Sequence, residues 1–305
     1  MKRLHETRER DILGKIKGIE MATRKSGWAK FPYDGKAFDL EGDKLKKAWP
    51  MLHAGDGEPF PDERRAAFLL KSVGKNAPQH TDAEGISSQL QAAWRAFHRG
   101  DFQQAFELGE ALGAIGTSVA VKAIGIHATY LVDDEAAQLA RFNQAVELAE
   151  TAIGNLPGEA NSHYRHAFAL GLYSQRISVT KALKMGLAGK VRASLDKTLV
   201  LDPKHAEAHT ALAIYHAEII GKIGALIGGM TYGAKAAEAE KHIQQALKLT
   251  PDSPIAHVEH ANLLLLLHGD KKETAAANAY EKAAKLKPRD AMEKLDGEFA
   301  RSQIE

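Results

Sequence analysis

One helical-hairpin pattern is written three times between about Ala160 and Pro288. The first helices of the three copies begin EANSHYRHAFAL, HAEAHTALAIYH and DSPIAHVEHANL. Each second helix ends at a proline, in DKTLVLDP, QQALKLTP and EKAAKLKP. A pair of antiparallel helices cannot bury its apolar face alone, so such pairs stack on one another into a solenoid. The repeat therefore predicts a scaffold without identifying what the scaffold holds.

Two further hairpins are expected before this repeat. The first carries Trp94 and Phe97, then the tight turn GDF at 100–102 and the small residue Ala105. This order of first helix, tight turn and second helix resembles the tetratricopeptide repeat (TPR), which usually has a small residue where this chain has Leu112. The resemblance implies an all-α, right-handed, TPR-like helical-hairpin solenoid of about five hairpins.

The second of these hairpins is predicted from its helices at 118–131 and 135–153. Its second helix carries Ala145, Ala149 and Ala152. Small residues at these intervals let neighbouring helices approach closely. This is the packing that a stacked array of hairpins requires.

The prolines that end the later hairpins show where chain has been added. They stand at 157, 203, 251 and 288 and are separated by 46, 48 and 37 residues, against about 34 for the standard repeat. The excess falls between the two helices of a hairpin, at 174–190 and 218–235. Connections within hairpins emerge along one edge of a solenoid, so the two insertions are predicted to be neighbours. More weakly, 160–298 is similar to the T-component proteins of TRAP transporters and to the regulators of microtubule dynamics.

The second insertion, GKIGALIGGMTYG, is apolar and conformationally loose because glycine permits many backbone conformations. Its glycines alternate with Ile223, Leu226, Ile227, Met230 and Tyr232. Three interpretations stay open for this edge: a glycine-rich helix and loop that closes on the preceding insertion, a rim for an apolar ligand or partner helix, and shallow membrane insertion.

The N-terminal residues 1–25 are predicted to form a basic helix, because residues 1–30 hold nine Lys/Arg against four Asp/Glu. It either packs on the first repeat or binds a partner or an anionic surface. Residues 28–40, WAKFPYDGKAFDL, begin an aromatic segment and lack helical periodicity. We call them the strap.

Two short helices are expected after the strap, at 43–53 and at 61–73 with Pro61 in the first turn, and 76–85 reads as a linker. Seven of the chain's 20 aromatic residues lie between 28 and 68. Aromatic side chains are costly to leave in water. The strap is therefore expected to pack on its own solenoid. Alternatively, it packs on another subunit, which would give a homo-oligomer, or on a different partner.

Histidine recurs at one position of successive first helices, as His163, His209 and His257. His205 and His209, at i and i+4, share a helix face as metal-binding pairs do. However, equivalent residues of neighbouring repeats lie about 8–10 Å apart, too far for one ion whose ligands stand at about 2 Å. We expect each histidine to fill space inside its hairpin and to make one hydrogen bond.

The resemblance also implies a concave groove lined mainly by first helices. By register its residues include Tyr164, Phe168, Thr210, Ile214, Val258 and Asn262. These side chains are largely apolar or uncharged, and the lysine and asparagine clamp of chaperone-binding members is not found at these positions. A hydrophobic peptide is the predicted guest, either external or the strap itself.

Several function classes are disfavoured by composition and motif. The chain has no cysteine, which excludes disulfides, thiolate zinc sites and a cysteine nucleophile. A net charge of +2 gives no global drive towards nucleic acid or anionic lipid, and no apolar run approaches the ~18 residues of a membrane span. HExxH, GxSxG and P-loop motifs are not found. We expect a cytoplasmic protein without a cofactor, metal or catalytic activity.

The predicted organisation is an N-terminal helix, strap and short helices at 1–80, two hairpins at 81–159, three hairpins at 160–290 and a capping helix at 291–305. The predicted function is a non-catalytic scaffold that binds a peptide or protein segment in an apolar concave groove. The alternatives are a carrier or sensor of a small apolar ligand beside the insertions 174–190 and 218–235, and a metal-dependent enzyme that uses the histidines.

Overall fold

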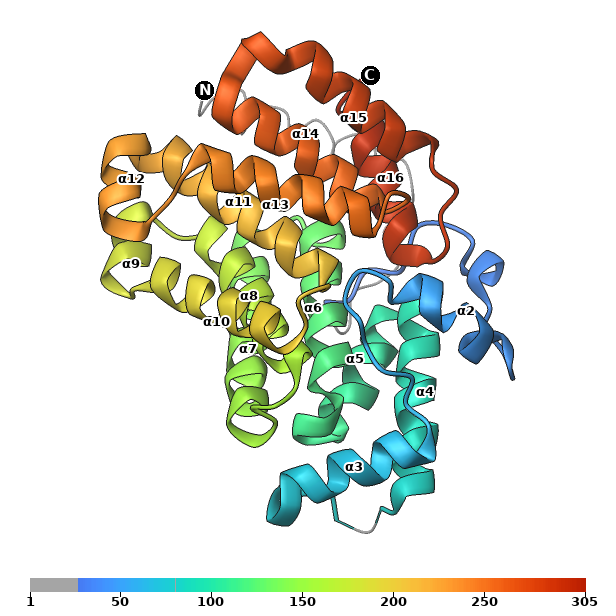
Figure 1. Cartoon of the computed structure of the whole chain (residues 1–305). Helices are drawn as coiled ribbons and strands as arrows, with labels where there is room; N and C mark the ends of the chain where they lie inside the picture. The colour runs from blue at the N-terminus through green and yellow to red at the C-terminus, as the bar shows by residue number, and fades with distance from the viewer. Residues whose placement is uncertain (1–26, 80) are drawn as a thin grey trace.

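The fold is all-α in a computed structural model that describes residues 27–79 and 81–305 (Figure 1). The basic helix expected at 1–25 lies outside the described residues. Within them the chain forms α-helices and short 3-10 helices and no strand.

Consecutive helices pack in antiparallel pairs, as the repeat predicted, and the fold is TPR-like. The pairs are α4 (Ala83–Arg99) with α5 (Phe102–Ala111), α6 (Thr117–Leu131) with α7 (Glu135–Asn155), α8 (Ala160–Gln175) with α10 (Leu187–Leu201), α11 (Ala206–Ile223) with α13 (Ala236–Leu249), and α14 (Pro254–His268) with α15 (Glu273–Lys285). α16 (Ala291–Ser302) follows, packs on α14 and α15 and also reaches α4. Short 3-10 helices lie at Gly35–Phe38, Gly74–Asn76, Gly113–Gly116 and Gly269–Lys272.

The first hairpin illustrates how sequence sets these boundaries. The Asp82 carboxylate accepts a hydrogen bond from the Gly85 amide and begins α4. Gly100 ends α4 with φ +94°, in the left-handed region. A Cβ added at Gly100 would lie 2.6 Å from the ring of Phe31, so the position also requires glycine for contact with the strap.

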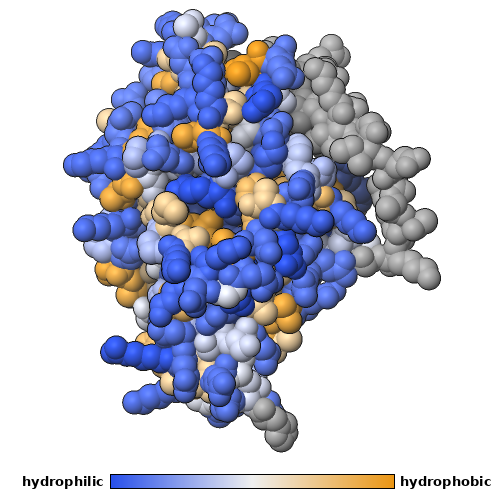
Figure 2. Space-filling model, turned by 90° about the vertical axis from the view of Figure 1, so that its right-hand side faces the viewer, coloured by the Kyte–Doolittle hydropathy of each residue, from blue (hydrophilic) through white to orange (hydrophobic). Residues whose placement is uncertain are grey.

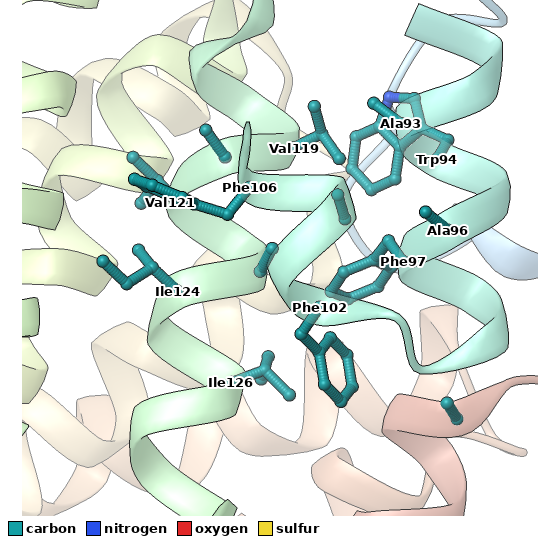
Figure 3. Close-up of a cluster of buried hydrophobic side chains, with 14 of the residues drawn as sticks. Ala93, Trp94, Ala96, Phe97, Phe102, Phe106, Val119, Val121, Ile124 and Ile126 are labelled. Carbon is teal, nitrogen blue, oxygen red and sulfur yellow. The ribbon is translucent and has the colours of Figure 1, made fainter. Parts of the chain in front are cut away.

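A continuous aromatic core joins α4, α5 and α6 (Figure 3). Phe97 of α4 lies 5.6 Å from Phe102 of α5 between ring centroids, Trp94 of α4 points towards Val119 of α6, and Phe106 of α5 points away from α4. The strap packs on this core, with Phe31 at 6.3 Å from Phe102 between ring centroids and Trp28 at 5.4 Å from Phe106. The strap therefore lies on its own solenoid, which was the first of the two alternatives.

The short helices α2 (Lys44–Leu52) and α3 (Glu63–Val73) follow the strap. α3 begins two residues later than predicted, because the Asp62 side chain caps it by accepting from the Arg65 amide and Pro61 stays outside the helix. Leu69 of α3 belongs to the same buried cluster as Leu112. This explains why a large residue stands at Leu112, since an additional helix covers the first hairpin there.

Both insertions contain a short helix. α9 (Val179–Lys184) lies in the first and α12 (Ala225–Tyr232) in the second. α11 continues to Ile223, so the insertion at 218–235 begins inside a helix, and α12 is a glycine-rich helix of the kind that the first of the three interpretations expected. Figure 1 shows α9 and α12 at the same edge of the array, in agreement with the prediction from hairpin geometry.

Candidate functional site

The loop between α2 and α3 lies against the first helices of three hairpins. We call residues 53–60, HAGDGEPF, the groove loop. Its backbone joins α11, where the Gly55 carbonyl accepts a hydrogen bond from the Glu207 amide at 2.8 Å. The loop also fits closely, since a Cβ at Gly57 would meet the carboxylate of Asp202 at 2.8 Å. This positions the loop's acidic side chains towards α6 and α8.

A buried ion network forms around Asp56, whose side chain is 0% exposed. Its Oδ2 accepts hydrogen bonds from Lys122 Nζ of α6 at 2.8 Å and from Arg165 Nη2 of α8 at 2.6 Å. Its Oδ1 lies 2.8 Å from His53 Nδ1. Glu207 completes the network at 3.2 Å from Lys122 and 3.5 Å from Arg165. Two cations and two carboxylates are thus balanced inside the protein.

The electrostatics of this network favour its charged form. Burial alone would raise the pKa of Asp56, but Lys122, His53 and Arg165 hold that pKa well below its usual value. Burial would lower the pKa of Lys122, yet Asp56 and Glu207 raise it. For His53 burial dominates and lowers the pKa to about 4, so its neutral ring donates from Nδ1 to Asp56.

A second acidic residue of the loop, Glu58, is held by neutral donors. Its Oε2 accepts from Ser118 Oγ at 2.5 Å and from Asn161 Nδ2 at 2.8 Å. Burial and the nearby Asp56 raise the pKa of Glu58. Asn161 Nδ2 also donates to the Asp56 carbonyl at 2.9 Å, and its Oδ1 accepts from His205 Nε2 at 3.0 Å. The amide of Asn161 therefore donates hydrogen bonds both to the backbone and to a side chain of the loop.

His205 connects this network to the start of α11. Its Nδ1 accepts from the Ala208 amide at 3.0 Å as the helix cap, which leaves Nε2 as the donor to Asn161. Burial lowers the pKa of His205 to about 4, consistent with a neutral ring. Its ring lies 4.5 Å from that of Tyr164.

Aromatic rings close the other side of the loop. His53 stacks on Trp49 at 4.0 Å between centroids and meets Trp94 edge-on at 4.6 Å. His98 of α4 lies 2.8 Å from Asp290, the residue that caps α16. The C-terminal helix is thereby tied to the first hairpin beside the groove loop.

The six predicted groove residues are spread along α8, α11 and α14. Tyr164 lies at the ion network, whereas Phe168 packs against Gly125, where an added Cβ would lie 2.5 Å from its ring. Thr210 is buried and donates to the Ala206 carbonyl at 3.1 Å. The remaining three lie in the C-terminal half: Ile214 is half-buried, Val258 is buried, and Asn262 accepts from Tyr280 Oη at 2.5 Å.

The predicted insertion-edge residues divide into two groups. Leu226, Ile227 and Met230 are exposed. Ile223 and Tyr232 are half-buried, and the Tyr232 carbonyl lies 3.4 Å from Tyr215 Oη, which donates to it. Two surface hollows have volumes of about 590 and 640 Å³. The first is lined by residues 81–89 at the start of α4 and the second by the strap with the α4–α5 turn, and the insertions contribute to neither.

The repeated histidines each bond to the carbonyl of the proline six residues earlier. His163 Nε2 lies 2.9 Å from the Pro157 oxygen, and the corresponding distances are 3.2 Å for His209 and 2.7 Å for His257. This repeated contact fixes the entry to each first helix and supplies the hydrogen bond that was expected of each histidine. His209 departs from the expectation of a single bond, because its Nδ1 also lies 2.8 Å from His242 Nδ1. Among the described residues no group of three or more His, Asp or Glu is arranged to hold a metal ion.

Sequence reasoning missed the residues at the centre of the network. Lys122 stands alone in the apolar helix TSVAVKAIGIHATYL, and a single cation in such a helix is the signal that would have found it. Arg165 lies between two histidines, and Asp56 lies between the two short helices predicted at 43–53 and 61–73. The carboxylate of Asp56 is held on these first helices by Lys122 and Arg165, and its backbone carbonyl by Asn161, at positions other than the six predicted ones.

Comparisons with known proteins add the following. Across residues 27–79 and 81–305, no helix has both the length and the apolar character that crossing a membrane requires. No known family profile matches the chain, and no curated protein matches it. Among solved structures the chain is similar to a thermophilic TPR protein in Thermus thermophilus, with 19% identity, a TM-score of 0.49, and coverage of 70% of this chain and 97% of that one. The TPR-like character of the fold rests on the consecutive helical pairs of the chain itself.

Proposed function

We propose that this protein is a non-catalytic interaction scaffold whose concave face binds an extended acidic segment of a partner protein. Residues 53–60 of its own chain are the segment that occupies this face when no partner is bound. The observation that carries the proposal is the convergence of Lys122, Arg165 and Asn161, from two neighbouring first helices, on the carboxylate and backbone of Asp56.

The chemistry of the face selects an acidic guest. Removing a carboxylate from Lys122 and Arg165 leaves an excess of buried positive charge, and breaking a buried ion pair costs about 3–5 kcal/mol. A guest that brings its own carboxylate keeps the network balanced, whereas a neutral or basic guest does not. Asn161 adds recognition of an extended backbone, because it donates to the carbonyl of the residue that carries the carboxylate.

The direct test supplies the groove loop as a separate peptide. In the full chain, residues 54–59 are replaced by a glycine and serine segment of the same length. The probe is a fluorescent peptide copying residues 51–62, and its matched control carries asparagine at the position of Asp56. We expect the loop-replaced chain to bind the acidic peptide at least about tenfold more tightly than the control peptide, and the unaltered chain to bind both weakly, as measured by fluorescence anisotropy.

An Arg165→Met substitution in the loop-replaced chain should abolish the preference for the acidic peptide. A folded loop-replaced chain that binds both peptides equally contradicts the proposal. If the loop-replaced chain loses its cooperative thermal transition, the groove loop is a permanent part of the core, and the partner site must be sought elsewhere on the solenoid.

A further inference from the structure

Exposed apolar side chains are concentrated on the two insertions. Within the described part of the chain ten large hydrophobic residues are exposed, and six of them lie on or beside α9 and α12. Their exposed fractions are 45% for Val179, 45% for Leu183, 40% for Met185, 77% for Leu226, 58% for Ile227 and 82% for Met230. We call the exposed face of α9 and α12 the insertion edge. Apolar residues gathered in this way mark an interaction surface.

The orientation of α12 is the reverse of that of an ordinary surface helix. Gly228 faces the protein, where an added Cβ would lie 2.9 Å from Ile219 of α11. At about 100° per residue, Leu226 and Met230 point almost directly away from Gly228. The smallest side chain is therefore turned inward and the largest apolar ones outward. This arrangement contributes little to the protein's own core and leaves the large apolar side chains of α12 on the surface.

α9 presents a matching face from the preceding hairpin. Ala182 packs towards the cluster of α8 and α10, while Val179 and Leu183, at i and i+4, lie on one exposed side. Figure 1 places both helices at the edge of the array farthest from α2. The opposite side, which faces the viewer in Figure 2, is mostly hydrophilic, with apolar residues in small separate areas.

The charge of the two segments is one-sided. Residues 176–190 and 219–235 contain six Lys/Arg and no Asp/Glu, although Glu218, just outside, pairs with Lys222 at 2.6 Å. The whole chain has a net charge of +2, so the rest of it carries −4. Lys181 and Lys184 flank the exposed face of α9, and Lys235 follows α12. Positive charge therefore surrounds the insertion edge and not the protein as a whole.

We propose that the insertion edge docks this protein on an anionic lipid membrane surface, with the apolar side chains of α9 and α12 in the interfacial layer and the lysines at the level of the lipid phosphates. Short helices that combine an apolar face with basic residues insert shallowly into the headgroup boundary. An acidic surface attracts the surrounding lysines. The inference does not depend on the function proposed for the concave face, which lies on other residues.

Vesicle co-sedimentation of the full chain tests this inference. The vesicles are phosphatidylcholine alone, or phosphatidylcholine with about one quarter phosphatidylserine, at low and at physiological salt. We expect binding to the anionic vesicles that weakens with salt, and little binding to the neutral ones. Substituting both Leu226 and Met230 by serine should weaken binding by about tenfold or more. The double change Lys181→Gln and Lys184→Gln should weaken it by about fivefold per charge.

Matched control variants remove comparable residues elsewhere. Val200 is 73% exposed and Met51 57%, and their double serine variant should bind vesicles like the unaltered chain. Lys271→Gln with Lys272→Gln is the matched control for charge. Three results overturn the inference: no binding to anionic vesicles at low salt, equal losses in the control variants, or binding retained equally by all variants through the basic residues 1–30.

Discussion

The ion network around Asp56 and the insertion edge place their side chains in opposite ways. The ion network buries charge, with Asp56 and Arg165 almost completely withdrawn from water. The insertion edge exposes apolar groups, with Met230 at 82%. Buried charge is tolerated only where partners neutralise it, and exposed apolar surface is retained only where something else uses it. The first region is complete within the chain, whereas the second lacks its counterpart.

The largest effect on stability is expected from removing one cation from the ion network. Arg165→Met leaves Asp56 and Glu207 facing Lys122 alone, and we expect the free energy of unfolding to fall by about 3–5 kcal/mol. Urea denaturation followed by circular dichroism measures the loss. Lys285→Gln, which removes an exposed partner of Glu281, is the control and should change stability by less than about 0.5 kcal/mol. Equal effects of the two substitutions would show that the network is not integral to the fold.

The next largest effect is expected from acidification, which should lower the stability of the ion network through His53 and His205. The pKa of His53 and that of His205 are each lowered from 6.5 to about 4 by burial. The unfolded chain therefore binds more protons between these values, and stability that is complete above pH 6.5 is lost as pH falls towards 4. At about 1.4 kcal/mol per pKa unit the loss is up to about 3 kcal/mol per histidine.

The tryptophans provide a local readout of this loss. The chain has three, and Trp49 and Trp94 contact the ring of His53. Their fluorescence should report unfolding at progressively lower urea as pH falls from 7 to 5. A midpoint that does not change with pH would mean that burial does not lower the pKa of either histidine in the folded protein.

The hairpins were predictable from sequence because their signals are local and repeated. Turn residues, helix caps and the apolar period gave the helix pairs within a few residues. His163, His209 and His257 were interpretable because three copies place the same residue in the same context. The large residue at Leu112 could not be explained from the repeat pattern, because the helix that packs on it, α3, lies outside the repeat.

The ion network could not be read from the sequence, because it joins segments far apart in the chain. Asp56 is 66 residues from Lys122 and 109 from Arg165. No sequence periodicity connects such positions. The pairing of buried charges can be determined only from the positions of all the partners in the folded structure. The apolar residues of α12 were recognised, but the side that they face depends on how Gly228 seats on Ile219. The six groove positions and the insertion edge remain predictions about binding.

A smaller effect separates the two acidic residues of the groove loop. Glu58→Gln should cost no more than about 1 kcal/mol, because the amide oxygen of glutamine can still accept from Ser118 and Asn161. Burial raises the pKa of Glu58, which shows that this site favours the charged form of the side chain less than water does. Asp56→Asn should cost several times more, because it removes the anion between Lys122 and Arg165. Urea unfolding at pH 7 compares the two variants, and a reversed order would assign the central charge to Glu58.

The smallest effect on stability is expected at the insertion edge, and it sharpens the comparison most. Replacing Leu226 and Met230 together by serine should change the free energy of unfolding by no more than about 0.5 kcal/mol, because both side chains already contact solvent. The same variant should be more soluble, since its exposed apolar area is smaller. Urea denaturation and light scattering measure the two properties, with the Val200 and Met51 double serine variant as control. A loss of several kcal/mol would place these side chains in the core of the protein, and the insertion edge would no longer be a surface that awaits a partner.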